Sequence, residues 1–180
     1  MADAALKLMT VDEFLVWDDG TDTRYELVDG VPVAMAPPLT PHGAIVANVA
    51  YEVTHRTRLR PPCRAIAQAG VWVSEHRYFV ADVALTCAQP GRSPNVEDAS
   101  ILVEVLSPST RAHDLGVKLP TYKDLPSVEE IWLIDEAMAK NARPGQEMAA
   151  RLVQPGRFRS LSELAHGIRH LGRRRLPDVI

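Results

Sequence analysis

Long apolar runs, aromatic side chains and a charge excess of one sign are all scarce in this sequence. No stretch approaches the roughly 18 apolar residues that a membrane-spanning helix needs, so we expect no membrane segment. Aromatic residues make up 6% of the chain, which leaves little material for a surface that stacks bases. With 20 Lys and Arg against 23 Asp and Glu, the formal net charge is −3, which excludes a polycation that coats nucleic acid.

Cysteine is also scarce, and its spacing is uninformative. Cys63 and Cys87 form neither the dense framework of a small secreted protein nor a Cys-x-x-Cys metal pair. Nothing else in the chain requires an oxidising compartment, so we expect reduced thiols and a cytoplasmic protein. The six histidines show no His-Glu-x-x-His pattern, which argues against a zinc site.

The remaining composition is that of an ordinary globular protein. Hydrophobic residues account for 46% of the chain and charged residues for 24%, which argues against disorder or a coiled coil. A length of 180 residues is close to that of one typical domain, so we expect a single domain over residues 1–180.

Local patterns predict helices and strands that interleave up to about residue 136. Thr10 and Glu13 form a capping box before a short helix, and Asp29-Gly30 between two strand-like segments predicts a hairpin. Further helices are expected at 40–60 and 110–122, and further strands at 69–74, 78–86, 100–106 and 131–134. This order favours one sheet with helices packed on both faces.

Two carboxylates stand inside strands that are otherwise apolar. Side-chain alternation places Asp82 and Glu104 each on a face with apolar neighbours. A buried carboxylate must find a cation, take up a proton or reach solvent, because burying it ionised and unpaired costs several kcal/mol. A hard divalent cation such as Mg²⁺ satisfies both acids at once, since it prefers carboxylate oxygens and retains several waters. Pairing with arginines, or a place at the strand ends, is the alternative.

A lysine follows the second acid at helical spacing. Asp114, Lys118 and Tyr122 are four residues apart and form one stripe on a helix. If that helix returns beside the strand it leaves, Lys118 reaches the space in front of Glu104. There an ammonium group can orient a water or stabilise developing phosphorane charge. An exposed ion pair between Asp114 and Lys118 is the alternative.

Several motifs occur together in an order that resembles a known family. They are Tyr25-Glu26-Leu27-Val28-Asp29-Gly30, His42, Asp82, Leu102-Val103-Glu104-Val105-Leu106-Ser107-Pro108-Ser109-Thr110, Asp114, Lys118, Tyr122 and Glu130-Ile131-Trp132. The chain resembles the Uma2 family, also called domain of unknown function 820, whose fold belongs to the PD-(D/E)XK nuclease superfamily. The resemblance covers about residues 8–136.

This resemblance implies an α/β fold with a restriction-endonuclease-like core, in which helices flank a central mixed β-sheet. It implies a catalytic set made of Glu26, Asp82, Glu104 and Lys118. It also implies a metal site formed by Glu26, Asp82, Glu104 and the carbonyl of Val105. In most relatives of the superfamily the lysine lies two residues after the acid, where this chain has Leu106, so its role would move to Lys118. Ala81 stands where proline is usual.

The function expected from these residues is hydrolysis of phosphodiester bonds in DNA by an endonuclease that uses Mg²⁺ or Mn²⁺. No organic cofactor is expected. A homodimer is compatible with this function, because cutting two strands suits two sites related by twofold symmetry. One alternative is a catalytically silent nuclease-fold module that binds nucleic acid or a protein partner, and another is a small-molecule hydrolase with the same metal site.

Three other features receive structural interpretations. His42 and His113 are expected to be ordinary hydrogen-bonding residues, outside the catalytic set. The segment 107–110 fits a strand end followed by a helix cap better than a nucleophilic serine, since no Gly-x-Ser-x-Gly motif is present. The basic run 173–175 fits a solvated tail.

Overall fold

The computed structural model describes residues 8–137 and the two short strands at 149–152 and 159–160. The basic run at 173–175 therefore lies outside the described residues. The helical elements are α1 (Val11–Leu15), α2 (Thr40–Thr57), α3 (Arg111–His113), the π-helical turn η1 (Asp114–Lys118) and α4 (Leu119–Lys123). The strands are β1 (Tyr25–Val28), β2 (Val31–Ala34), β3 (Arg64–Ser74), β4 (Arg77–Thr86), β5 (Ala99–Leu106), β6 (Glu130–Asp135), β7 (Ala149–Leu152) and β8 (Arg159–Ser160). Within this part of the chain, no helix is long and apolar enough to cross a membrane.

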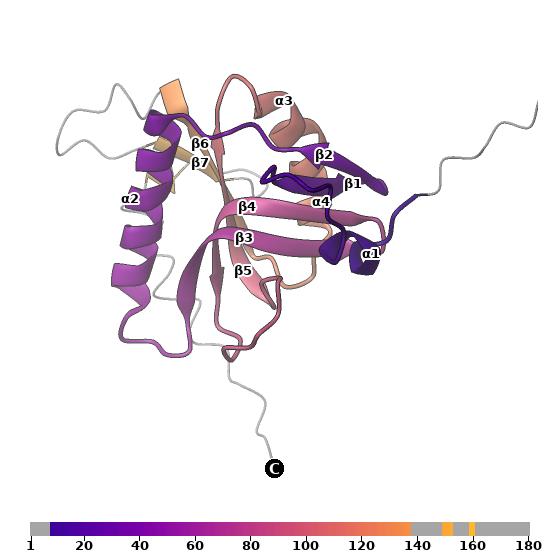
Figure 1. The fold of residues 1–180 in the computed structure, drawn as a ribbon. Helices are drawn as coiled ribbons and strands as arrows, with labels where there is room; N and C mark the ends of the chain where they lie inside the picture. The colour runs from indigo at the N-terminus through magenta and orange to yellow at the C-terminus, as the bar shows by residue number, and fades with distance from the viewer. Residues whose placement is uncertain (1–7, 138–148, 153–158, 161–180) are drawn as a thin grey trace, which may run out of the picture.

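The described strands form one eight-stranded mixed sheet, as the resemblance implies. Its order is β2-β1-β4-β5-β6-β7-β8, and β3 pairs with the other edge of β4. β5 and β6 run parallel, whereas the other paired strands run antiparallel. A parallel pair needs a crossover connection, and α3, η1 and α4 supply it here (Figure 1).

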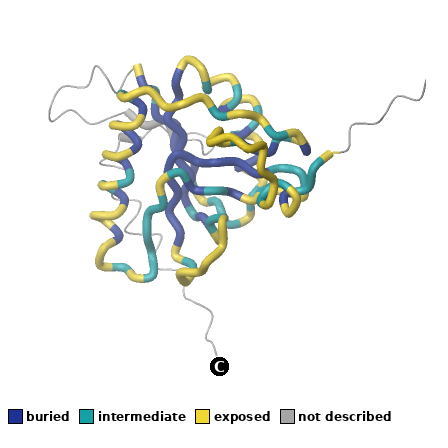
Figure 2. The backbone as a smooth tube through the Cα atoms, in the orientation of Figure 1, coloured by how far each residue is buried: buried dark blue, intermediate teal, exposed yellow. Residues whose placement is uncertain are grey.

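Helices cover both faces of the sheet. On one face, Val49 of α2 packs in a buried cluster with Val83 and Val103 of the central strands. On the other face, Tyr122 of α4 packs with Leu102 and with further residues of β5 and β6. Neighbouring residues of β5 serve opposite faces because strand side chains alternate. Figure 2 shows the resulting buried central strands and the exposed outer side of α2.

The sheet divides along one edge of β4. β1 pairs with β4 at Tyr78, and β5 pairs with β4 from Val83 onward, while β3 occupies the opposite edge. Between these two positions, the backbone of Val80 hydrogen-bonds to side chains instead of to a neighbouring strand. Its N–H donates to Glu26 (2.7 Å) and its carbonyl accepts from Lys118 (2.9 Å). Buried backbone groups need such partners, so this division of the sheet creates a place for charged side chains.

Most predicted elements are confirmed, with shifted boundaries. The capping box at Thr10 and Glu13 and the hairpin over Asp29-Gly30 are both present. The strand predicted at 69–74 begins at Arg64 instead, because Thr86 of the long strand β4 gives it a pairing partner. The helix predicted at 110–122 contains the π-helical turn η1, so the sequence pattern missed its change of helical type.

The expectation of reduced thiols is wrong. Cys63 and Cys87 form a disulfide, with an S–S distance of 1.96 Å. Arg64 pairs with Thr86, so the next position outward places the two cysteines opposite each other, with Cα atoms 3.8 Å apart. The register of two antiparallel strands decides this contact, and a sequence separation of 24 residues gives no sign of it.

Candidate functional site

A buried lysine lies at the centre of the charged cluster between β1 and β5. Nζ of Lys118 lies 2.8 Å from Glu26, 3.3 Å from Glu104 and 3.6 Å from Asp114. It also donates to the carbonyl of Val80. All three acids are nearly inaccessible to solvent, as is the lysine. One cation therefore serves three carboxylates that come from β1, β5 and η1.

The crossover from β5 to β6 brings this lysine into place. The chain leaves β5 at Leu106, turns through 107–110 and returns along the sheet in α3, η1 and α4. Asp114, Lys118 and Tyr122 are buried on the inner side of this segment, as their four-residue spacing predicts. The alternative of an exposed Asp114–Lys118 pair is excluded, because both side chains are buried.

Glu26 is held from both sides. Its Oε1 accepts from the amide of Val80, and its Oε2 lies 3.1 Å from Nε2 of His113. Burial by itself would raise the pKa of Glu26, but the contacts with His113 and Lys118 outweigh it and lower the pKa below its usual range. Glu26 is therefore ionised and anchors the lysine.

Glu104 lies in the most strongly desolvated part of the cluster. Its Oε1 accepts from the hydroxyl of Tyr122 (2.9 Å) and faces Lys118. Burial raises the pKa of Glu104 to about 8, although Lys118 opposes the rise and the charges of Asp82 and Asp114 add to it. Without a further cation, this carboxyl retains its proton near neutral pH.

Asp82 is held by a different set of partners. Its Oδ2 accepts from the amide of Val105 (2.7 Å) across the β4–β5 ladder. Its Oδ1 lies 3.1 Å from Nε2 of His42 in α2 and accepts from the side-chain amide of Gln68 at 3.1 Å. The hydrogen bond to Asp82 raises the pKa of His42 above its ordinary value, despite the opposing effect of burial. Three elements thus orient this one carboxylate.

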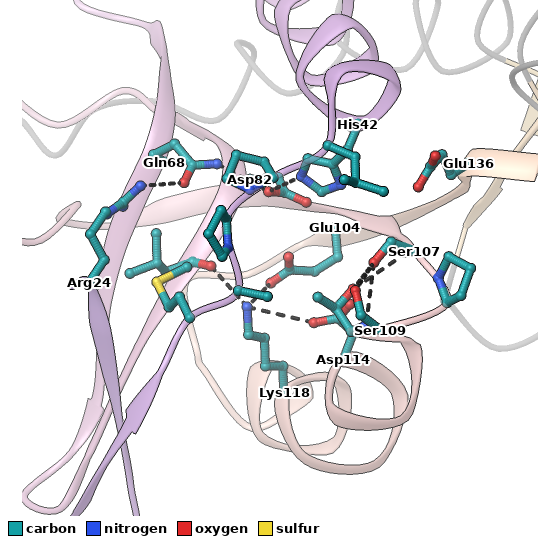
Figure 3. A pocket seen from close by; sticks show the side chains of 18 of the residues that line it. Arg24, His42, Gln68, Asp82, Glu104, Ser107, Ser109, Asp114, Lys118 and Glu136 are labelled. Atoms are coloured by element: carbon teal, nitrogen blue, oxygen red, sulfur yellow. Dashed lines mark hydrogen bonds and ion pairs between the residues drawn. The ribbon is translucent and has the colours of Figure 1, made fainter.

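Several of these side chains line a pocket of about 780 Å³ (Figure 3). Asp82, Glu104 and Lys118 lie in it together with Asp114 and Glu136. The segment 35–39 forms an apolar wall, and the hydroxyls of 107, 109 and 110 lie on another side. Glu26 is not among the described residues that line the pocket. The cavity therefore gives access to two of the three predicted metal-binding acids.

The donor set fits one kind of metal better than another. Within residues 8–137 and the two short strands, no group of three or more His, Cys, Asp or Glu side chains is arranged to hold a metal ion. Such a group is what a structural zinc site requires. Mg²⁺ binds through one or two carboxylates, with waters and substrate phosphate completing its shell. Asp82 and Glu104, on adjacent strands and in one pocket, fit that description.

The structure brings the predicted site residues into one region but divides them into two groups. Glu26, Glu104 and Lys118 are in direct contact, whereas Asp82 belongs to the group formed with His42 and Gln68. Val105 joins the site through its amide, which donates to Asp82. The resemblance had suggested its carbonyl as a ligand.

The sequence interpretation missed three residues that contact the predicted acids. His42 and His113, set aside as ordinary hydrogen-bonding residues, contact Asp82 and Glu26. Gln68 contacts Asp82 from a left-handed backbone conformation (φ 52°) inside β3. Such a backbone is costly for a non-glycine residue in a strand and is found mostly at functional sites. The sequence gives two signals: His42 stands among the ordered family motifs just after a helix start, and His113 is adjacent to Asp114.

Comparisons with known proteins show the family of this chain. A model of the Uma2 family, described as "Putative restriction endonuclease", matches residues 11–168. The chain is 25% identical over 141 residues to the uncharacterized protein sll1609 of Synechocystis sp. (strain ATCC 27184 / PCC 6803 / Kazusa), covering 76% of this chain and 80% of that protein. It is 27% identical over 131 residues to the uncharacterized protein slr1290 of the same organism, covering 70% of this chain and 68% of that protein.

A solved structure has the same fold. It is the crystal structure of a putative nuclease belonging to DUF820 from Anabaena variabilis ATCC 29413. The TM-score is 0.65 at 17% sequence identity, and the match covers 84% of this chain and 83% of the other. The expected nuclease-like α/β architecture, with helices flanking a mixed sheet, is thereby confirmed.

Proposed function

The chain belongs to the Uma2 family, and from this membership and the pocket we propose that it is a metal-dependent endonuclease that hydrolyses phosphodiester bonds of DNA. In this proposal, Asp82 and Glu104 hold Mg²⁺ or Mn²⁺, and Glu26 and Lys118 complete the catalytic set. Glu26 serves as the anchor of Lys118 rather than as a metal ligand, because its two oxygens already have three partners.

The observation that carries the proposal is a pair of acids from adjacent strands, buried yet open to one pocket. Ionising Glu104 is costly, because burial raises its pKa and the charge of Asp82 adds to the rise. A protein that needed only stability would gain from apolar residues at these positions. Binding of a cation and a phosphate in this pocket would account for the presence of both acids.

The residues of the chain supply binding, orientation and charge balance. A bound Mg²⁺ or Mn²⁺ polarises a phosphate oxygen and lowers the pKa of an attacking water. Asp82 and Glu104 offer carboxylate oxygens from two strands, and Lys118 holds Glu104 in position. His42 and Gln68 fix the rotamer of Asp82, as partners of metal ligands commonly do.

A plasmid-nicking assay tests the proposal. Purified protein is incubated with supercoiled DNA in the presence of Mg²⁺, Mn²⁺ or a chelator, and nicked and linear products are measured. We expect metal-dependent cleavage that falls by about 100-fold or more in Asp82→Asn and in Glu104→Gln. We expect a reduction of at least this size because mutation of a residue that only contacts a metal ligand already lowers metal affinity or activity by about 10–100-fold.

The matched control is Asp124→Asn, which neutralises an exposed acid at the end of α4. It should cleave as fast as the parent protein. Circular dichroism establishes that each variant is folded. Cleavage by a folded Asp82→Asn variant at the parental rate would contradict the assignment.

One observation favours a second candidate, a silent nuclease-fold module. Lys118 already pairs with Glu26, and Glu104 retains its proton near neutral pH when no further cation is bound, so the cluster does not depend on a metal for its charge balance. A silent module would bind oligonucleotides or a protein with every metal tested and cleave none. The nicking assay, together with an oligonucleotide-binding assay, separates the two functions.

A further inference from the structure

We propose that the pocket selects single-stranded DNA, so that the bond to be cut lies in an unpaired strand rather than in the interior of a duplex. This inference rests on the proposed nuclease function and adds the form of the substrate. Three properties of the pocket support it: the burial of the acids, the apolar wall at its mouth and the small number of permanent positive charges among its described lining residues.

The acids lie deep below the surface. Asp82 is 9% exposed, Glu104 3% and Lys118 4%. The cavity above them, about 780 Å³, falls within the range of about 300–1,000 Å³ typical of small-molecule sites. A duplex is stiff over about 150 base pairs and cannot bend into a cavity of this size. A flexible single strand can enter the cavity and bring one phosphate close to Asp82 and Glu104.

The mouth of the pocket is apolar on the side of the β2–α2 connection. Residues 36–39 are exposed, and Leu39 leaves 67% of its surface accessible. Unpaired bases expose apolar faces, and contact with aliphatic side chains such as those of Pro37, Pro38 and Leu39 removes these faces from water. In a duplex those faces are already stacked, and the outside offers mainly phosphate and sugar. This wall therefore favours an unpaired strand.

Permanent positive charge is sparse among the described residues that line the pocket. Among the described lining residues, Arg24 and Lys118 carry such a charge, and Lys118 is occupied by carboxylates. Asp22 adds an acid near Arg24. Proteins that grip duplex DNA tightly make about 6–10 phosphate contacts with basic residues. Exposed Arg24, hydrogen-bonded to Gln68 at 2.9 Å, can meet one phosphate of a strand that descends toward Asp82.

The cleavage test compares one labelled oligonucleotide in three forms with Mn²⁺: single-stranded, in a blunt duplex, and in a duplex with a long overhang. We expect cleavage of the single strand and of the overhang at least ten times faster than cleavage inside the duplex. Cleavage within the blunt duplex at the rate of the single strand overturns the inference.

A binding test separates this inference from the proposed hydrolysis. Fluorescence anisotropy with Asp82→Asn protein measures the affinity for the single strand and for the duplex without turnover. Ala36→Trp adds a bulky ring to the exposed apolar wall of the pocket, and Ala34→Trp adds the same ring at an exposed position of β2 outside the lining. We expect Ala36→Trp to weaken single-strand binding at least tenfold and Ala34→Trp to leave it unchanged.

The outcomes are distinct. If no DNA is cut but the single strand binds preferentially and Ala36→Trp weakens it, the hydrolytic proposal fails and the substrate inference stands. If the duplex binds as tightly as the single strand, or if Ala36→Trp has no effect, the substrate inference is overturned even when plasmid is nicked.

Discussion

Lys118 shows, at the scale of a single residue, how the fold retains buried acids. A lysine in a dry environment loses solvation, which by itself lowers its pKa, but the charges of Glu104, Glu26 and Asp114 more than reverse the effect. It therefore stays protonated. Removal of one partner from a buried ion pair typically costs about 3–5 kcal/mol, so this contact organises the core as well as the pocket.

Glu104 makes the stability of the metal-free protein depend on pH. Its pKa is about 8 in the folded chain and near 4.5 in the unfolded chain. Between these values the unfolded state has lost the proton and the folded state still holds it, so the free energy of unfolding falls as pH rises. We expect a loss of a few kcal/mol from pH 5 to pH 8, measured by urea denaturation with a chelator present.

Glu104→Gln is the matched variant, because it retains the shape without the titration. Its free energy of unfolding should fall less over the same pH range. His42, whose pKa is also raised, contributes a loss of the same sign in both proteins, so the difference between them isolates Glu104. Identical pH profiles for the two proteins would show that Glu104 does not titrate in this window.

At the scale of elements, the π-helical turn η1 connects the strand end to the lysine. Its wider turn includes Gly116, which is exposed and has open space where a Cβ would stand. Turns of this kind are rare and occur frequently at functional sites. Here Asp114 and Lys118 stand at the two ends of the turn, and both point into the cluster.

Deletion of Gly116 tests this role of η1. With one residue fewer, Lys118 follows Asp114 by three residues instead of four, which changes its direction relative to Glu26 and Glu104. We therefore expect the protein to lose about 3 kcal/mol or more of stability, as for a broken buried ion pair. Gly116→Ala is the control. It should stabilise by about 0.5–1 kcal/mol and leave cleavage unchanged. Denaturation curves of both variants, with the nicking assay, measure the effects, and a deletion variant as stable as the parent would refute the role.

At the scale of the whole molecule, a metal held between β4 and β5 should stabilise the entire sheet. A ligand that binds the folded chain alone at 100 times its Kd adds about 2.7 kcal/mol to the free energy of unfolding. We therefore expect Mn²⁺ to raise the Tm of the parent protein and to have no such effect on Asp82→Asn. An equal rise in both proteins would place the bound metal elsewhere.

Local periodicity predicted a large part of this architecture. The Asp29-Gly30 turn, the capping box and the alternation of β5 each depend on residues close together in the chain, and each is present. The same alternation predicted that Asp82 and Glu104 would be buried, and helical spacing predicted the inward stripe through Lys118. Such features follow from the repeat of 2 or 3.6 residues, which a sequence displays directly.

Which buried groups meet was decided by the tertiary structure alone. The pairing of Glu26 with Lys118, the contact of His42 with Asp82 and the Cys63–Cys87 disulfide join residues 24 to 92 positions apart. These contacts depend on the register of paired strands and on the point where β1 and β5 separate along β4. The sequence by itself determined that acids would enter the core. The division of the sheet determined which cation each acid meets and which acids reach the pocket, because only the folded strands fix distances between remote segments.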